Sequence, residues 1–311
     1  MSRRSEHSHL WLPQFWPMWL GVAGFWLIDK LPWPEKRCLA RGLGWFAFHI
    51  LRIRRRVVFV NLRLCFPGKT EREIRTLARA HYDSLALGLF ELCAGWWAPV
   101  GDLPPHRVIG LGHLRDALAR NSGAILLTAH FTTLEICGRF MSESHPMGGL
   151  YRDPNNPVVA RLMRGQRVRH LSPAVHFDDL RGLVRALRGG HAIWYAPDQG
   201  KRTKSSEILP FFGVPAVTNT ATGKIAGMTG APVVPYFARR EADYSYTLTI
   251  LPPLENFPTA DAAADAIRIN RLIEEHVRQA PEQYFWVHKR FKGRGPGYPE
   301  VYQAAASRHG S

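Results

Sequence analysis

Hydrophobic and polar positions divide the 311-residue chain into stretches with different patterns. Residues 10–28 are its most apolar stretch, 19 residues that carry no charge. Residues 35–66 follow with an Arg-rich helical pattern that ends at a Pro-Gly turn. A second amphipathic helix is expected from about residue 70 to 96, because Thr70 and Glu73 form a capping-box pattern before regularly spaced apolar residues.

Beyond residue 107 the pattern changes to short apolar runs that alternate with amphipathic stretches. The runs predict strands at 123–129, 148–151, 191–196, 232–238 and 246–251. The amphipathic stretches predict helices at 113–120, 133–142, 156–169, 178–188, 217–228 and 260–279. Strands that alternate with helices of about ten or more residues predict an α/β fold, a mixed sheet flanked by helices.

Charge is concentrated near the apolar stretch. The chain has a formal net charge of +16, and residues 1–69 hold 12 Lys and Arg against 3 Asp and Glu. Five of the ten Trp lie within or just after residues 10–28. A 19-residue helix rises about 28 Å, close to the hydrocarbon thickness of a bilayer. We therefore predict a membrane anchor over residues 1–33, spanning the bilayer or lying in its interface, with a buried core helix as the alternative.

The remainder, residues 34–311, is expected to be one domain, with a helical part at 34–105 and an α/β part at 106–295. The four cysteines lie far apart and form no CxxC pair, so neither a disulfide framework nor a structural zinc site is expected. No metal or cofactor is expected.

His130 and Glu135 form the strongest candidate for chemistry. His130 directly follows the predicted strand 123–129, and reacting groups in open α/β sheets collect at the carboxyl ends of strands. Glu135 falls in the first turn of the next helix, from where its carboxylate could orient the imidazole. The alternative is structural, because Thr132 and Glu135 also match a capping box, and a histidine at a strand end is often a hydrogen-bonded surface residue.

Further candidate residues lie after other predicted strands and near the carboxyl end of the chain. Arg152 is presented by a turn and offers a planar fork for phosphate or carboxylate groups. The residues that we predict to bind substrate are Arg152, Asn155, Asn156, Arg167, Arg169, Asp198, Gln199, His288, Arg290 and Lys292.

Seven blocks, in order along the chain, resemble the late (secondary) acyltransferases of lipid A, the lauroyl and myristoyl transferases of Gram-negative inner membranes. The wider group is the lysophospholipid acyltransferase superfamily, with its H-x4-D/E motif. The blocks are NLRLCFP (61–67), ILLTAHFTTLE (125–135), YRDPNNP (151–157), IWYAPDQG (193–200), LPFFGVPA (209–216), APVVPYFARR (231–240) and APEQYFWVHKRFK (280–292).

The resemblance implies a glycerolipid-acyltransferase-like fold. It also implies transfer of a lauroyl-like chain, of roughly 10–14 carbons, from acyl-carrier protein to the hydroxyl of a primary 3-hydroxyacyl chain on a lipid A precursor. His130 would be the general base and Glu135 its partner, while Arg152 and Asp198 would bind substrate and order the site. Many relatives have a third block similar to PDHD, whereas this chain has Pro197-Asp198-Gln199-Gly200. Asp198 carries over from the resemblance, but the roles of Gln199 and Gly200 do not.

The same resemblance implies a place on the cytoplasmic face of the inner membrane of a Gram-negative bacterium, in contact with its phospholipids. The sequence leaves two alternative functions. A glycerolipid acyltransferase that acts on lysophosphatidate shares the H-x4-D/E motif but usually has Asp in it. A nucleic-acid-binding protein would account for the charge of +16, but the chain has no recognisable binding motif, and its basic residues gather beside an apolar segment.

Overall fold

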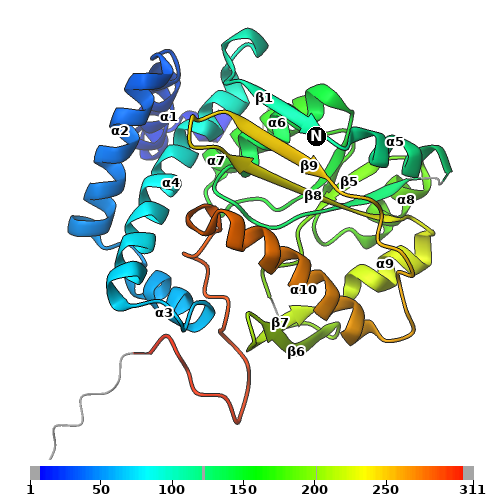
Figure 1. Ribbon diagram of the computed structural model, residues 1–311. Coiled ribbons are helices and arrows are strands. Elements are labelled where there is room, and N and C mark those ends of the chain that lie inside the picture. Colours follow the sequence, from blue (N-terminus) through cyan, green and yellow to red (C-terminus); the bar gives the residue numbers. More distant parts are fainter. Residues whose placement is uncertain (1–7, 121–122, 201, 304–311) are drawn as a thin grey trace, which may run out of the picture.

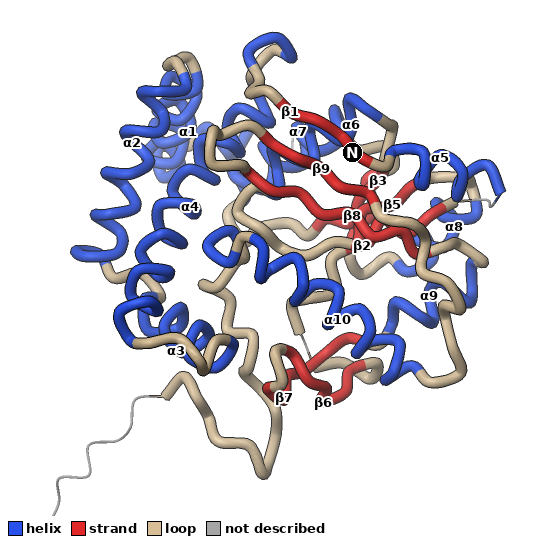
Figure 2. Tube along the Cα trace, viewed as in Figure 1, coloured by secondary structure: helices blue, strands red, loops and turns tan. Residues whose placement is uncertain are grey.

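The computed structural model describes residues 8–120, 123–200 and 202–303, without the side chains at positions 8, 9, 167 and 168 (Figure 1). A central sheet carries helices on both faces, and the N-terminal helices form a separate layer at one side of it (Figures 1 and 2). This arrangement confirms the predicted α/β class with a mixed sheet flanked by helices.

The described part of the chain contains a seven-stranded sheet in the order β1-β9-β8-β2-β5-β3-β4. Its strands are β1 (His106–Ile109), β2 (Ala124–Leu127), β3 (Gly148–Tyr151), β4 (Ala174–His176), β5 (Ala192–Tyr195), β8 (Val233–Arg240) and β9 (Tyr246–Ile250). β8 and β9 pair antiparallel, and the other neighbours pair parallel. A separate hairpin joins β6 (Ser206–Phe211) to β7 (Val214–Asn219).

The longest described helix is α4 (Glu71–Trp97), and the capping box predicted at its start is present. The Thr70 hydroxyl accepts a hydrogen bond from the Glu73 N–H, and the Glu73 carboxylate accepts one from the Thr70 N–H. The other helices are α1 (Trp16–Asp29), α2 (Trp33–Phe46), α3 (Arg55–Cys65), α5 (Leu111–Arg120), α6 (Leu134–Ser144), α7 (Pro157–His170), α8 (Leu180–Arg188), α9 (Ala221–Thr229) and α10 (Ala262–Gln279). α4 packs against α1, α2, α3 and α6, and so joins the N-terminal layer to the α/β part.

Both faces of the sheet are buried, which explains why its central strand is apolar at every position. Side chains of β2 alternate between two cores, with Ile125 and Leu127 in one core and Ala124 and Leu126 in the other. The first core also contains residues of α8, α9 and α10, and the second contains residues of α5 and α6. Continuous apolar runs are typical of parallel strands covered on both faces.

Two predicted helices differ from the structure. The Arg-rich pattern at 35–66 is divided between α2 and α3, because the chain takes left-handed conformations at Arg52 (φ 52°) and Arg54 (φ 50°). The helix predicted at 217–228 begins only at Ala221, because residues 214–219 pair with β6. The two strands are joined by a two-residue turn at Phe212 and Gly213, both with positive φ, and a glycine between two apolar runs is a local sign of such a hairpin.

The apolar stretch at 10–28 was predicted to be one helix of 19 residues. The structure instead has short 3₁₀ turns at Ser8–Trp11 and Pro13–Phe15, followed by the 14-residue helix α1. Pro13 and Pro17 each lie in the first turn of a helical segment, where proline is tolerated. Within residues 8–120, 123–200 and 202–303, no helix combines the length and apolarity needed to cross a membrane.

Candidate active site

The imidazole of His130 is held by the carboxylate of Asp198. Nδ1 of His130 lies 2.6 Å from Oδ1 of Asp198, and the backbone N–H of His130 donates to Oδ2 at 3.1 Å. His130 follows β2 and Asp198 follows β5, and these strands are parallel neighbours whose carboxyl ends lie together. Residues 68 positions apart in the sequence are thereby brought into contact.

Asp198 is almost fully buried and accepts a third hydrogen bond, from the hydroxyl of Tyr284 at 3.0 Å. Burial by itself raises the pKa of this carboxyl group, but the attraction of His130 and the hydrogen bonds from His130 and Tyr284 outweigh burial and hold the pKa below its ordinary value. Asp198 is therefore an anion at neutral pH. Because it accepts the Nδ1–H of His130, the Nε2 lone pair remains available for a proton.

The loop that carries His130 is attached to two other parts of the chain. The carbonyl of His130 accepts the N–H of Phe285 at 3.1 Å, and the N–H of Thr132 donates to the carbonyl of Gln283 at 2.8 Å. On the α4 side, the hydroxyl of Ser84 lies 2.7 Å from that of Thr132. These contacts restrict the motion of the imidazole relative to Asp198 and Tyr284. Tyr284 was not singled out from the sequence, although it lies in the last of the seven blocks.

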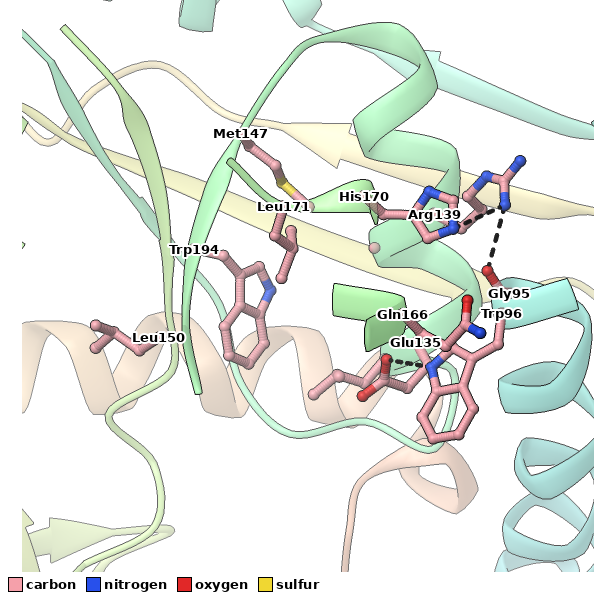
Figure 3. Close-up of a pocket in the computed structure, with 12 residues that line it drawn as sticks. Gly95, Trp96, Glu135, Arg139, Met147, Leu150, Gln166, His170, Leu171 and Trp194 are labelled. Atoms are coloured by element: carbon pink, nitrogen blue, oxygen red, sulfur yellow. Dashed lines mark hydrogen bonds between the residues drawn. The ribbon is translucent and has the colours of Figure 1, made fainter. Parts of the chain in front are cut away.

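Glu135 lies in the first turn of α6, as predicted, where the positive end of the helix dipole favours a carboxylate. Its Oε2 accepts a hydrogen bond from the indole N–H of Trp96 at 3.2 Å (Figure 3). The described hydrogen bonds of the His130 ring lead to Asp198 and not to Glu135. The orienting contact that we predicted for Glu135 is thus made by Asp198, and a catalytic role for Glu135 itself stays a prediction.

His130 and Glu135 line the same cavity of about 600 Å³ at the carboxyl ends of β2 and β5. One wall is apolar and comes from Leu85, Leu89 and Leu92 of α4. The predicted substrate-binding residues that also line this cavity are Arg152, Gln199, His288 and Lys292. The cavity therefore combines a paired histidine, cationic side chains and an extended apolar surface.

Two predicted substrate-binding residues have structural roles instead. Arg290 is buried, and its guanidinium donates to the carbonyl of Val217 at 2.6 Å and to the hydroxyl of Thr218 at 3.2 Å, so it supports β7 from inside. The Asn156 side chain accepts the N–H groups of Val158 and Val159 and caps the start of α7. The basic pattern near the carboxyl end could not distinguish an interior arginine from one facing a substrate.

Two further predicted residues are not brought to the cavity wall, and the side chain of a third is not described. Asn155 and Arg169 are exposed and do not line it. Arg167 belongs to α7, and its side chain lies outside the described part of the structure. His288 does line the cavity, but burial lowers the pKa of its imidazole to about 4, so at neutral pH it would meet a substrate as a neutral group.

A second buried histidine makes the stability of the fold sensitive to acid. His81 on α4 is fully buried, its Nδ1 lies 3.0 Å from the carbonyl of Glu282, and burial lowers its pKa to about 4 from 6.5. Between pH 6.5 and 4 the unfolded chain binds a proton there that the folded chain does not, so stability falls as the pH falls through this window. We expect a loss of up to about 3 kcal/mol from this group.

The measurement is the free energy of unfolding in denaturant at several pH values between 7 and 4. The variant His81→Gln removes the titrating group, so its free energy of unfolding should decline less steeply over the same range. A wild-type protein whose stability does not change between pH 6.5 and 4 would contradict this expectation, as would an equal slope for the variant.

Comparison with known proteins supplies the family context of this site. The model of the family described as bacterial lipid A biosynthesis acyltransferase matches residues 4–293. The chain is 38% identical over 293 residues to the lipid A biosynthesis lauroyltransferase of Escherichia coli strain K12, covering 93% of this chain and 96% of that protein. It is 35% identical over 293 residues to the lipid A biosynthesis palmitoleoyltransferase of the same strain, covering 93% and 95%. A solved 1-acyl-sn-glycerophosphate acyltransferase from Thermotoga maritima aligns with a TM-score of 0.37 at 16% identity, covering 79% of this chain and 97% of that one.

Proposed function

The chain belongs to the bacterial lipid A biosynthesis acyltransferase family, and on that premise we propose that it transfers a fatty acyl chain from acyl-carrier protein to a hydroxyl of a lipid A precursor. Membership makes the protein an acyltransferase. The observation that carries the proposal is His130, paired with the buried Asp198, in the wall of a large, partly apolar cavity. The acceptor is proposed to be the hydroxyl of a primary 3-hydroxyacyl chain, and the transferred chain to be lauroyl-like.

In the proposed reaction, Nε2 of His130 removes the proton of the acceptor hydroxyl as its oxygen attacks the carbonyl carbon of the acyl thioester. A carbon–oxygen bond forms, and the carbonyl oxygen becomes an oxyanion. When this intermediate collapses, the carbon–sulfur bond breaks and the imidazolium returns the proton to the departing thiolate. Asp198 keeps Nδ1 protonated and stabilises the transient imidazolium.

The thioester is already activated, so the reaction needs a base and oxyanion stabilisation but no covalent nucleophile. Arg152 lines the cavity and is exposed, which makes its guanidinium a candidate donor to the oxyanion or a ligand for a phosphate of the acceptor. Lys292 lines the same cavity and adds a second cationic group. Cationic groups of this kind suit a phosphorylated glycolipid.

The direct test is an assay with purified protein, lauroyl-acyl-carrier protein and a tetra-acylated lipid A precursor, with product detected by mass spectrometry. We expect a product heavier by one lauroyl chain. Lysophosphatidate is offered as a competing acceptor, because a glycerolipid acyltransferase would use it instead. Transfer to lysophosphatidate alone would overturn the proposal.

Membrane attachment is part of the proposal and rests on exposed side chains. We use the term apolar N-terminal surface for the exposed residues of α1, α2 and the adjoining turns, namely Trp11, Leu12, Trp16, Leu20, Phe25, Trp26, Leu27, Leu39, Trp45, Phe46, Ile50, Leu51 and Ile53. The surface extends well past residue 33, the end of the predicted anchor. Exposed Arg52 and Arg54 adjoin it, where they could meet anionic headgroups.

The same layer of helices lies next to the site. α4 packs against α1 and α2, and it also contributes Leu85, Leu89 and Leu92 to the cavity that contains His130. One helix thus separates the apolar N-terminal surface from the catalytic cavity, so a lipid substrate would have a short path from a bilayer. We propose that this surface lies in the interface of the inner membrane on its cytoplasmic face.

Substitution of exposed apolar side chains of α1 should weaken binding to lipid. Leu20 is 73% exposed and Trp26 is 47% exposed, so Leu20→Ser and Trp26→Ser remove apolar contact without opening a core cavity. We expect each to lower partitioning into phosphatidylglycerol-containing vesicles by roughly tenfold, the effect of about 1.4 kcal/mol. The control is Leu180→Ser on α8, which is 51% exposed and distant from α1 in the sequence and in Figure 1. Equal partitioning of all variants in vesicle sedimentation would refute the proposed surface.

A further inference from the structure

A second, smaller cavity lies behind the catalytic cavity, and we call it the inner chamber. Four residues line both cavities, namely Leu134, Glu135, Leu150 and Trp194. The ring centroids of Trp194 and His130 are 6.1 Å apart, with the two rings nearly perpendicular. Trp194 therefore marks the boundary between the reacting imidazole and the inner chamber.

The inner chamber is apolar on the side of the sheet. Met147, Leu171 and Trp194 form that side, and Figure 3 shows their side chains grouped together. Polar residues line the opposite side: Trp96 donates to Glu135, and the guanidinium of Arg139 lies 3.1 Å from the ring nitrogen of His170. The buried Oε1 of Gln166 has no hydrogen-bond partner among the described residues.

Gly138 of α6 also lines the inner chamber, and it contributes no side chain. A Cβ atom built at Gly138 would meet no other atom within 4 Å, so open space lies beside this helix. The volume available to a guest is about 50 Å³. A single water needs about 10–15 Å³ by the same measure, so the chamber has room for a few atoms of methylene size.

We propose that the inner chamber receives the terminal carbons of the transferred acyl chain, and that the missing side chain at Gly138 sets how long that chain can be. The inference rests on the proposed function, because it assumes a fatty acyl thioester with its carbonyl carbon at His130. From that point the chain needs an apolar path, and the path past Trp194 leads to Met147 and Leu171. The cationic residues Arg152 and Lys292 line the catalytic cavity and not the inner chamber. Their positive charge suits the phosphorylated acceptor.

The chamber is small enough to discriminate between chains that differ by two carbons. One methylene moved from water into an apolar site contributes about 0.8 kcal/mol, close to a fourfold change in affinity. Exclusion of a chain that no longer fits is stronger, and one methylene too many in a shaped pocket changes kcat/KM by about 10–200-fold.

The test is Gly138→Leu, compared with wild type on acyl-carrier protein donors of 8, 10, 12 and 14 carbons. The new side chain enters open space, and leucine favours a helix more than glycine does, so the fold should be retained. We expect kcat/KM for the 12- and 14-carbon donors to fall at least about tenfold, with less than about threefold change for the 8-carbon donor. The reciprocal variant Leu171→Ala enlarges the chamber and should shift the preferred donor to a longer chain.

The matched control is Gly112→Leu. Gly112 also lies in a helix, α5, and a Cβ there also meets nothing within 4 Å, but it lines neither cavity. Its donor preference should equal that of wild type. If Gly138→Leu reduces kcat/KM equally for all four donors, or for none, the assignment of the chamber is overturned. A wild-type protein that transfers no chain of any length to a lipid A precursor would refute the proposed function and this inference together.

Discussion

Replacement of His130 by alanine is expected to reduce acyl transfer by about 10²–10⁴-fold or more, the range that general-base catalysis contributes. The alcohol that attacks the thioester is a weak acid, so without a base its proton has no acceptor at the moment of attack. The measurement is kcat in the lauroyl transfer assay at saturating donor. His130 is the partner of the buried Asp198 carboxylate, so the thermal midpoint should be measured alongside to separate a loss of catalysis from a loss of stability.

His176 offers a matched control for this prediction. His176 is the last residue of the parallel strand β4, a position similar to that of His130 after β2. It is also partly exposed, and its Nδ1 lies 3.9 Å from Oδ2 of Asp178. It does not line the cavity that contains His130. His176→Ala should therefore transfer at the wild-type rate. Near-normal transfer by His130→Ala would show that another group is the base.

Local sequence patterns were enough to find most of the elements that position this site. The strand at 148–151 has the predicted bounds, and the helices α6 and α10 begin within a residue or two of the predictions. The two helices pack through the apolar face that their own pattern predicts. The hairpin β6–β7 was not predicted, because residues 217–219 were included in the helix predicted at 217–228, and the short strands β1 and β4 were not predicted either. The turn of the hairpin is local, whereas the support that buried Arg290 gives to β7 comes from a distant part of the chain.

The sequence identified candidate residues of the site, but it did not identify the pairing of His130 with Asp198. His130, Arg152 and Asp198 each follow a strand and were recognised as candidates from that position. The partner of His130 was assigned to Glu135 because the two are five residues apart in the sequence. Which strand lies beside β2 depends on the strand order of the sheet, and that order is set by packing over the whole domain. The proximity of β5, and hence of Asp198, could not be deduced from the spacing of residues.

Substitution of Asp198 by asparagine is expected to lower kcat by about 10²–10⁴-fold while KM changes little, because Asp198 acts through His130 and not on substrate. Asparagine keeps the shape of the side chain but loses the negative charge that stabilises the imidazolium. It can also present its amide group to Nδ1, which favours the tautomer with the proton on Nε2. Such a tautomer cannot accept the proton of the acceptor hydroxyl. The thermal midpoint should be measured alongside, since Asp198 is buried and also bonded to Tyr284.

A double-mutant cycle then decides how Glu135 acts. Tyr284→Phe removes a group bonded to Asp198, so its effect on kcat should be much smaller in an Asp198→Asn background than in wild type. Glu135 accepts a hydrogen bond from Trp96, and the described hydrogen bond of the His130 ring goes to Asp198, so we expect the effects of Glu135→Gln and Asp198→Asn on kcat to multiply. If they instead coincide, with the double variant no slower than Asp198→Asn alone, both carboxylates act through the imidazole. In that case the dyad seen between His130 and Asp198 would be only part of the catalytic unit.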